Sequence, residues 1–115
     1  MKVIRILILS AIAISLAGCE LNERTFNEAR PKLRQRQDIQ ADYMHKCTRR
    51  VKYSHIELKR HMAGFMHTEI DGLPEKVCGR MLRGYLSGRM KFQDFKALMT
   101  GQKFTPGMVQ ILRAG

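Results

Sequence analysis

Cysteine and histidine are the residues of this sequence with the widest range of possible chemistry. The three cysteines are Cys19, Cys47 and Cys78. No two of them have the Cys-x-x-Cys spacing that is typical of redox-active pairs, so we do not expect thiol–disulfide catalysis. A cysteine can also carry a lipid or form a structural disulfide, and the sequence around each thiol must decide between these uses.

The histidines are spaced too widely to share one helix face. They are His45, His55, His61 and His67, at intervals of ten, six and six residues. Zinc ligands on a helix lie three or four residues apart. His67, Glu69 and Asp71 are close enough in the chain to converge in one turn around a hard or borderline metal ion. A solvated polar turn explains the same residues better, and we therefore predict no metal site.

The sequence contains none of the common catalytic signatures, such as a nucleophile elbow, a phosphate-binding glycine loop or an HExxH helix. Ser54 and His55 are adjacent, but neighbouring residues of a helix do not face each other. We therefore predict that the protein is not an enzyme and that it needs no cofactor.

Residues 1–18 are organised as an export signal, and Cys19 follows them. Lys2 and Arg5 supply positive charge, and residues 6–16 form an uncharged run of eleven residues. This run is shorter than the ~20 apolar residues that cross a bilayer, but it suits a signal peptide. The tetrapeptide Leu16-Ala17-Gly18-Cys19 follows. Together these features resemble the lipobox signal of bacterial lipoproteins, with a match at all four lipobox positions. The resemblance covers residues 1–19 only.

The lipoprotein resemblance implies that Cys19 is modified and becomes the new N-terminus. In that family the thiol receives a diacylglycerol, a signal peptidase cleaves between Gly18 and Cys19, and the new amine is often acylated as well. Two or three acyl chains anchor a protein stably, because each buried CH₂ contributes about 0.8 kcal/mol. An Asp after the cysteine usually signals inner-membrane retention; Glu20 stands there instead, which favours the outer membrane, facing the periplasm. An ordinary signal peptide with a chance cysteine is the alternative.

Export also bears on the other two cysteines. With Cys19 lipidated, Cys47 and Cys78 remain as an even pair in an oxidising compartment, where a disulfide is expected. Closing a loop of this length stabilises a fold by roughly 3–4 kcal/mol in the chain-entropy model. Two buried free thiols are the alternative.

The chain is strongly basic, with 21 Lys and Arg against 10 Asp and Glu, for a formal net charge of +11. Loss of Lys2 and Arg5 with the signal lowers this charge to +9. Nucleic acid is a poor candidate partner in the envelope. The accessible polyanions are lipopolysaccharide phosphates, anionic headgroups, teichoic or capsular polymers and acidic proteins. A solvated helix surface explains the charge equally well, because no dense basic run dominates.

Past the signal, we expect residues 19–30 to be a polar tether with one aromatic residue, Phe26, and residues 31–115 to form a helical domain. Pro31 suits a first helical turn. A four-residue spacing then places Ile39, Tyr43, Cys47 and Val51 on one helix face, and the pattern continues through Leu58, Met62, Phe65 and Met66. This segment is one long helix or two, with a break near Ser54-His55.

The second half of the domain is interrupted at Asp71-Gly72-Leu73-Pro74, where the next helix begins. The clearest amphipathic pattern of the chain follows, in Val77, Cys78, Met81, Leu82, Tyr85 and Leu86. Gly88 suits its end. A shorter helix buries Phe92, Phe95, Leu98 and Met99 and ends at Gly101, and Thr105-Pro106 opens the last one.

These patterns predict an all-α domain of three to four helices with a methionine-rich core. One disulfide, between Cys47 and Cys78, is expected to join two of the helices face to face. The predicted function is a non-catalytic envelope lipoprotein that binds an envelope protein, as inhibitors, immunity proteins and secretion accessories do. The alternative is an envelope-structural lipoprotein whose basic surface contacts anionic lipid or lipopolysaccharide.

Overall fold

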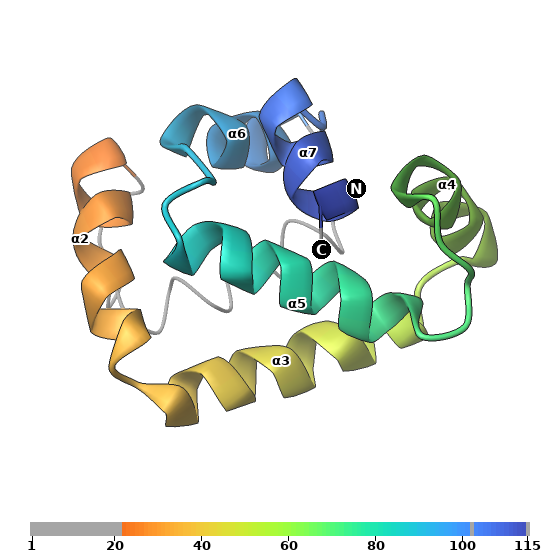
Figure 1. Cartoon of the computed structure of the whole chain (residues 1–115), viewed down its shortest axis with the longest axis horizontal. Coiled ribbons are helices and arrows are strands. Elements are labelled where there is room, and N and C mark those ends of the chain that lie inside the picture. The colour runs from red at the N-terminus through yellow and green to blue at the C-terminus, as the bar shows by residue number, and fades with distance from the viewer. Residues whose placement is uncertain (1–21, 102, 115) are drawn as a thin grey trace.

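The computed structural model describes residues 22–101 and 103–114, and within them the protein is all-α (Figure 1). The helices are α2 (Glu23–Arg34), α3 (Gln37–Lys52), α4 (Ile56–Met66), α5 (Leu73–Leu86), α6 (Phe92–Lys96) and α7 (Pro106–Ala114), and a π-helical turn, η1 (Ala97–Gly101), continues α6. The all-α prediction is confirmed, with more and shorter helices than the three or four expected. The signal peptide and Cys19 lie outside the described residues. None of the described helices combines the length and the apolar character that a membrane crossing requires.

Helix α5 is the centre of the domain. Helix α3 runs along one side of it, α6 and α7 lie on the other side, and α2 and α4 stand at opposite ends of the long axis (Figure 1). The core is rich in methionine, as predicted: six methionines of the described residues are buried, at positions 62, 66, 81, 90, 99 and 108. Unbranched methionine side chains fill the irregular gaps between short helices.

Helix α2 occupies residues that we expected to form a tether. It begins after Asn22, whose side chain accepts a hydrogen bond from the Thr25 backbone N–H at 2.9 Å. Phe26 is fully buried and Leu33 nearly so. The folded domain therefore begins at Glu23 rather than at Pro31, and Pro31 lies inside α2 instead of opening a helix. Burial of Phe26, Ala29 and Leu33 in the core holds this polar segment in the fold.

Of the two alternatives for the first amphipathic segment, one long helix or two, the structure has two, with the break near Ser54-His55. Helix α3 ends at Lys52, with Tyr53 as its C-cap, and α4 begins after His55. The His55 ring accepts a hydrogen bond from the Glu57 backbone N–H at 3.2 Å, while the Ser54 hydroxyl donates to the Arg50 carbonyl at 2.7 Å. This adjacent pair therefore finishes one helix and starts the next.

Helix α5 has the bounds that the sequence indicated. Gly72 precedes it with φ at 77°, Pro74 lies in its first turn, and Gly88 follows its end with φ at 85°. Gly84 allows the close approach of α7, because a Cβ atom there would lie 2.5 Å from the Ile111 Cγ2 atom.

The last two helices are joined through Asp94, the one buried charged residue among those described. Its carboxylate accepts hydrogen bonds from the Lys91 backbone N–H at 3.0 Å and from the Thr105 hydroxyl at 2.5 Å. The Thr105 oxygen in turn accepts from the Met108 N–H at 3.1 Å, so Thr105 caps α7 as the sequence predicted.

Candidate binding surface

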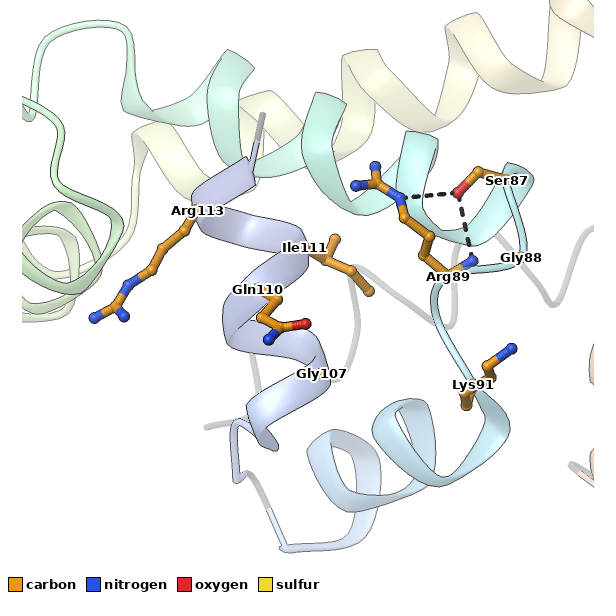
Figure 2. A pocket seen from close by; sticks show the side chains of 8 residues that line it. All are labelled: Ser87, Gly88, Arg89, Lys91, Gly107, Gln110, Ile111 and Arg113. Carbon is orange, nitrogen blue, oxygen red and sulfur yellow. Dashed lines mark hydrogen bonds between the residues drawn. The ribbon is translucent and has the colours of Figure 1, made fainter.

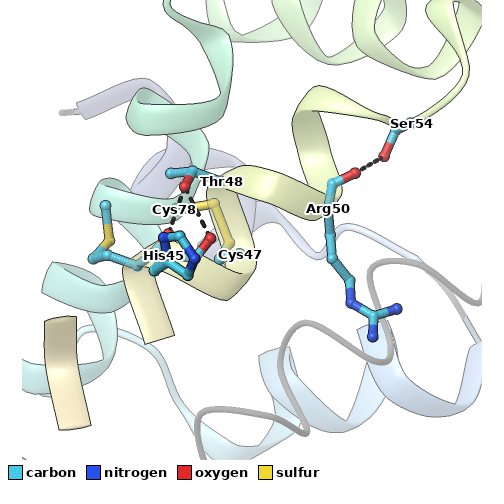
Figure 3. The surroundings of a disulfide bond; sticks show 7 residues. His45, Cys47, Thr48, Arg50, Ser54 and Cys78 are labelled. Carbon is cyan, nitrogen blue, oxygen red and sulfur yellow. Dashed lines mark hydrogen bonds between the residues drawn. A yellow bond between two sulfur atoms is a disulfide. The ribbon is translucent and has the colours of Figure 1, made fainter. Parts of the chain in front are cut away.

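The predicted disulfide is confirmed and joins α3 to α5. The sulfur atoms of Cys47 and Cys78 are 2.07 Å apart, and the two Cα atoms 5.9 Å apart. Cys47 is 1% exposed and Cys78 is fully buried, so solvent does not reach the bond. Figure 3 shows the bond at the α3–α5 contact, with the Arg50 side chain extending away from it. The disulfide therefore has a structural role, and it fixes the position of the solvent-facing side of α3.

Five basic side chains have a structural role, because they donate to backbone carbonyls at or just beyond the ends of other helices. Arg30 donates to Tyr85 O (2.6 Å) and Met90 O (3.3 Å), Arg34 to Leu86 O (2.7 Å), Lys59 to Lys52 O (2.9 Å), Arg80 to Leu112 O (2.6 Å) and Arg113 to Phe65 O (2.5 Å). The last carbonyls of a helix lack partners within it and form the negative end of its dipole. Part of the net positive charge therefore holds the helices together.

Among these five cations, Arg30 also lies against two aromatic rings. Its guanidinium carbon lies 5.3 Å from the Phe26 ring centroid and 5.1 Å from that of Tyr85. The Tyr85 hydroxyl is buried and donates to the Phe26 carbonyl at 2.7 Å. Burial raises the pKa of Tyr85 to about 12, and the nearby Arg30 charge partly offsets this rise.

Four further cations belong to ion pairs on the surface. The pairs are Arg24–Glu28, Arg36–Asp38, Lys46–Asp42 and Arg60–Glu57, with nitrogen–oxygen distances of 2.9–3.5 Å. The hydrogen bond from Arg36 lowers the pKa of Asp38 to about 2. Exposed pairs of this kind add little to stability, but they neutralise charge locally.

The cations of the last two turns of α3 are arranged differently. His45, Thr48, Arg49, Lys52 and Tyr53 recur at three- and four-residue spacing, so they share the side of α3 that faces away from its buried stripe of Tyr43, Cys47 and Val51. Together with Pro74 and Glu75 at the start of α5 they line a hollow of about 420 Å³. We call these seven residues the elbow hollow, because they lie where α3 turns into α4.

Arg49, Lys52 and Tyr53 are the side chains of the elbow hollow that are most available to a binding partner. Within the described part of the chain, neither the Arg49 guanidinium nor the Lys52 ammonium has a hydrogen-bond or ion-pair partner. Tyr53 is 75% exposed, which makes it the most exposed large hydrophobic residue of that part. The Lys52 nitrogen lies 5.7 Å from the Tyr53 ring centroid. The hollow thus offers two cations without hydrogen-bond or ion-pair partners in the described chain, and an aromatic ring that is 75% exposed.

A second concavity, of about 690 Å³, lies between the α5–α6 connection and α7 (Figure 2). Its lining includes three cations, Arg89, Lys91 and Arg113. Arg89 donates to the Ser87 hydroxyl at 3.2 Å, and Arg113 extends away from the other labelled side chains towards its partner, the Phe65 carbonyl. This groove is basic, but its cations diverge and two of the three are engaged.

The turn that contains His67, Glu69 and Asp71 does not form a cluster. His67 is the left-handed C-cap of α4, with φ at 57°, and all three side chains are exposed. Across residues 22–101 and 103–114, no three His, Cys, Asp or Glu side chains are grouped so that they could hold a metal ion.

Comparison with protein-family models, curated proteins and solved structures finds no match to this chain. Function must therefore be inferred from the residues of this chain. Cleavage at Gly18–Cys19 and lipid attachment at Cys19 fall outside the described residues and stay predictions.

The elbow hollow was not predicted from the sequence. The signal for its α3 half is present, because residues 45, 48, 49, 52 and 53 have helical spacing and include neither an acidic nor an aliphatic residue. The stronger pattern in the same helix is the apolar stripe through Cys47, which lies on its opposite side. The α5 half comes from a contact between helices, which spacing within one helix does not reveal.

Proposed function

We propose that this chain is a lipid-anchored protein of the bacterial cell envelope and that its helical domain binds another envelope protein without catalysis. Cys19 is the anchor after cleavage at Gly18, and the outer membrane, facing the periplasm, is the proposed location. Inhibitors, immunity proteins and secretion accessories are the kinds of protein that work in this way.

The observation that carries this proposal is the elbow hollow. Tyrosine and arginine are enriched in protein interfaces, and they dominate the small groups of residues that supply most of the binding energy. Arg49 and Tyr53 are four residues apart on one face, and neither side chain makes a hydrogen bond or ion pair within the described residues. The disulfide one turn away holds the backbone beneath them, which lowers the entropy lost on binding.

The first test is recovery of a partner from the native envelope. The full-length lipoprotein is crosslinked in cells, purified and washed at high salt, and the proteins bound to it are identified. Wild type is compared with an Arg49→Ala, Tyr53→Ala double variant and with a matched Lys96→Ala, Gln93→Ala control on α6. We expect one stoichiometric protein with wild type and control, and its loss from the double variant.

The lipid anchor is tested separately. A Cys19→Ala variant should leave the membrane fraction, and continued fractionation with the membrane would overturn the anchor.

A second candidate function rests on the groove of Figure 2. Its lining carries Arg89 and Lys91 and contains no acidic residue. A lipoprotein with this surface against anionic lipid or lipopolysaccharide would have an envelope-structural role. Binding of that kind weakens as salt rises, because the Debye length falls to about 10 Å at 0.1 M. The test is flotation of the protein with anionic vesicles. Flotation at low salt but not at high salt would favour this candidate over the first, provided that the Arg89→Ala, Lys91→Ala double variant does not float at either.

A further inference from the structure

We propose that the elbow hollow binds an acidic segment of the protein partner. Carboxylates of the segment lie against Arg49 and Lys52, and an apolar or aromatic side chain lies on the Tyr53 ring. This inference rests on the proposed function, since it names the chemistry of the partner at the same site.

The charges around the hollow favour a carboxylate ligand. Residues 46–60 contain six Lys or Arg and one acidic residue, Glu57. Lys46 and Arg60 are neutralised in ion pairs, and Lys59 is engaged at the end of α3. Arg49, Arg50 and Lys52 remain without ionic partners in the described chain. Carboxylates form short, charge-assisted hydrogen bonds with such groups, and complementary charge also speeds association.

Stabilisation of the C-terminal end of α3 does not account for the Arg49 and Lys52 side chains. Basic residues in a last turn interact favourably with the helix dipole. However, the end carbonyls already have partners: the Tyr53 N–H donates to Arg49 O at 3.2 Å, and the Lys59 ammonium donates to Lys52 O. The donors of the Arg49 and Lys52 side chains therefore stay available to a ligand.

Tyr53 indicates that the ligand is a peptide chain with side chains of more than one kind. Its ring packs on no core residue and meets solvent over most of its area. Ile56, three residues further on, is 41% exposed. Covering these two side chains removes apolar area from water, which favours binding. A purely ionic polymer offers no apolar group for this purpose.

Glu75 separates a protein segment from a phosphate-rich polymer. It lines the same hollow from the first turn of α5, where its negative charge opposes a dense polyanion. A protein segment avoids this conflict, because a backbone N–H or a basic side chain can face Glu75 while its carboxylates face Arg49. The hollow is thus mixed in charge and selects a patterned ligand.

The position of the hollow relative to the anchor also favours a protein. Three residues separate Cys19 from Glu23, the start of α2, and the four Cα-to-Cα steps between them reach at most about 14 Å. Helix α2 therefore lies at the membrane end of an anchored domain. The α3–α4 turn lies towards the other end of a molecule 34 Å long, next to α4 (Figure 1). Soluble and membrane proteins reach that end more readily than lipid headgroups do.

The test is photocrosslinking in cells with the full-length lipoprotein. Tyr53 is replaced by the photoreactive aromatic residue benzoylphenylalanine, and a matched control carries the same probe at the exposed Gln93 on α6. Crosslinked segments are sequenced by mass spectrometry. We expect a single protein segment with more Asp and Glu than Lys and Arg at position 53, and no such segment at position 93. Charge reversal with Arg49→Glu and Lys52→Glu should lower the crosslink yield about tenfold, whereas Lys96→Glu with Lys103→Glu should leave it unchanged.

Other outcomes separate this proposal from the general function. Crosslinks from position 53 to lipopolysaccharide or phospholipid, or to a segment without acidic excess, overturn the acidic-segment proposal. A protein captured only from position 93 overturns it too, but leaves a binding module that uses another face. The absence of any protein from both positions overturns the proposed function itself. Unchanged denaturation midpoints show that the charge-reversed variants are folded. If charge reversal affects folding, the neutral Arg49→Gln, Lys52→Gln double variant replaces it, and its crosslink yield should lie between those of wild type and the charge-reversed variant.

Discussion

Basic and aromatic side chains occur at both ends of this molecule. At one end they hold helices together, and at the other they face solvent. At the α2 end, Arg30 lies against Phe26 and Tyr85 and donates to two carbonyls near the end of α5. In the elbow hollow, Arg49 and Tyr53 are likewise an arginine and an aromatic residue, but they face solvent. Net charge alone therefore does not identify a binding surface. The informative feature is whether the donors and rings already have partners within the fold.

The largest expected effect is a contrast between two aromatic residues, Phe26 and Tyr53. Phe26 is fully buried, with ring centroids of Tyr85, Phe92 and Phe95 within 5.0–5.6 Å. Phe26→Ala should lower the free energy of unfolding by about 3–5 kcal/mol, as measured by urea denaturation. Tyr53→Ala should change it by less than about 0.5 kcal/mol. Wild-type stability in Phe26→Ala would mean that residues 23–34 are a tether after all.

Removal of the disulfide should have the next largest effect. The bond joins α3, which carries most of the elbow hollow, to the central helix α5 across 31 residues of sequence. The Cys47→Ala, Cys78→Ala double variant should lose about 3–4 kcal/mol of unfolding free energy, and each single variant should lose a similar amount. Denaturation of wild type with and without reductant provides the control. A double variant as stable as oxidised wild type would show that α3 and α5 pack without the bond.

The parts of the fold that were predicted are those with short-range signals. Tyr43, Cys47 and Val51 form a stripe on α3, and Cys78 belongs to the corresponding stripe on α5, so two patterns indicated one disulfide contact. Helix ends at Gly88 and Thr105 followed from turn and cap chemistry.

Helix α2 was missed because its signal is weak within the segment itself. Its buried residues are Phe26, Ala29 and Leu33, and polar or charged residues surround them. What holds it is contact with residues more than fifty positions away, such as the hydrogen bond from Arg30 to Tyr85. For the same reason, the sequence showed the positive charge but not which cations are engaged. The free cations of the elbow became distinguishable only once the partners of the others were known.

Substitution of one arginine at each end compares the two regions directly. Arg30→Met removes a charged donor from two partly buried carbonyls, and its unfolding free energy should fall by about 2 kcal/mol, the usual contribution of a hydrogen bond to a charged group. Arg49→Met, the matched control, breaks no hydrogen bond or ion pair within the described chain and should have the stability of wild type. Equal losses in both variants would remove the distinction between structural and free cations.

The smallest effect at neutral pH is expected from the tyrosine hydroxyls, and it grows only in alkali. The pKa of Tyr85 is raised from 10.0 to about 12 by burial, and burial also raises that of Tyr43. The folded protein therefore keeps protons that the unfolded chain releases above pH 10, so stability is unaffected below that pH and falls as the pH rises towards 12. Tyr85→Phe should lose about 1 kcal/mol at neutral pH, with its bond to the Phe26 carbonyl, and should then lose less than wild type between pH 10 and 12. Tyr53→Phe is the matched control and should keep wild-type stability at neutral pH, because its ring is 75% exposed. Urea midpoints across this pH range distinguish the two, and a wild-type alkaline slope in Tyr85→Phe would show that the α2 end does not depend on a protonated Tyr85.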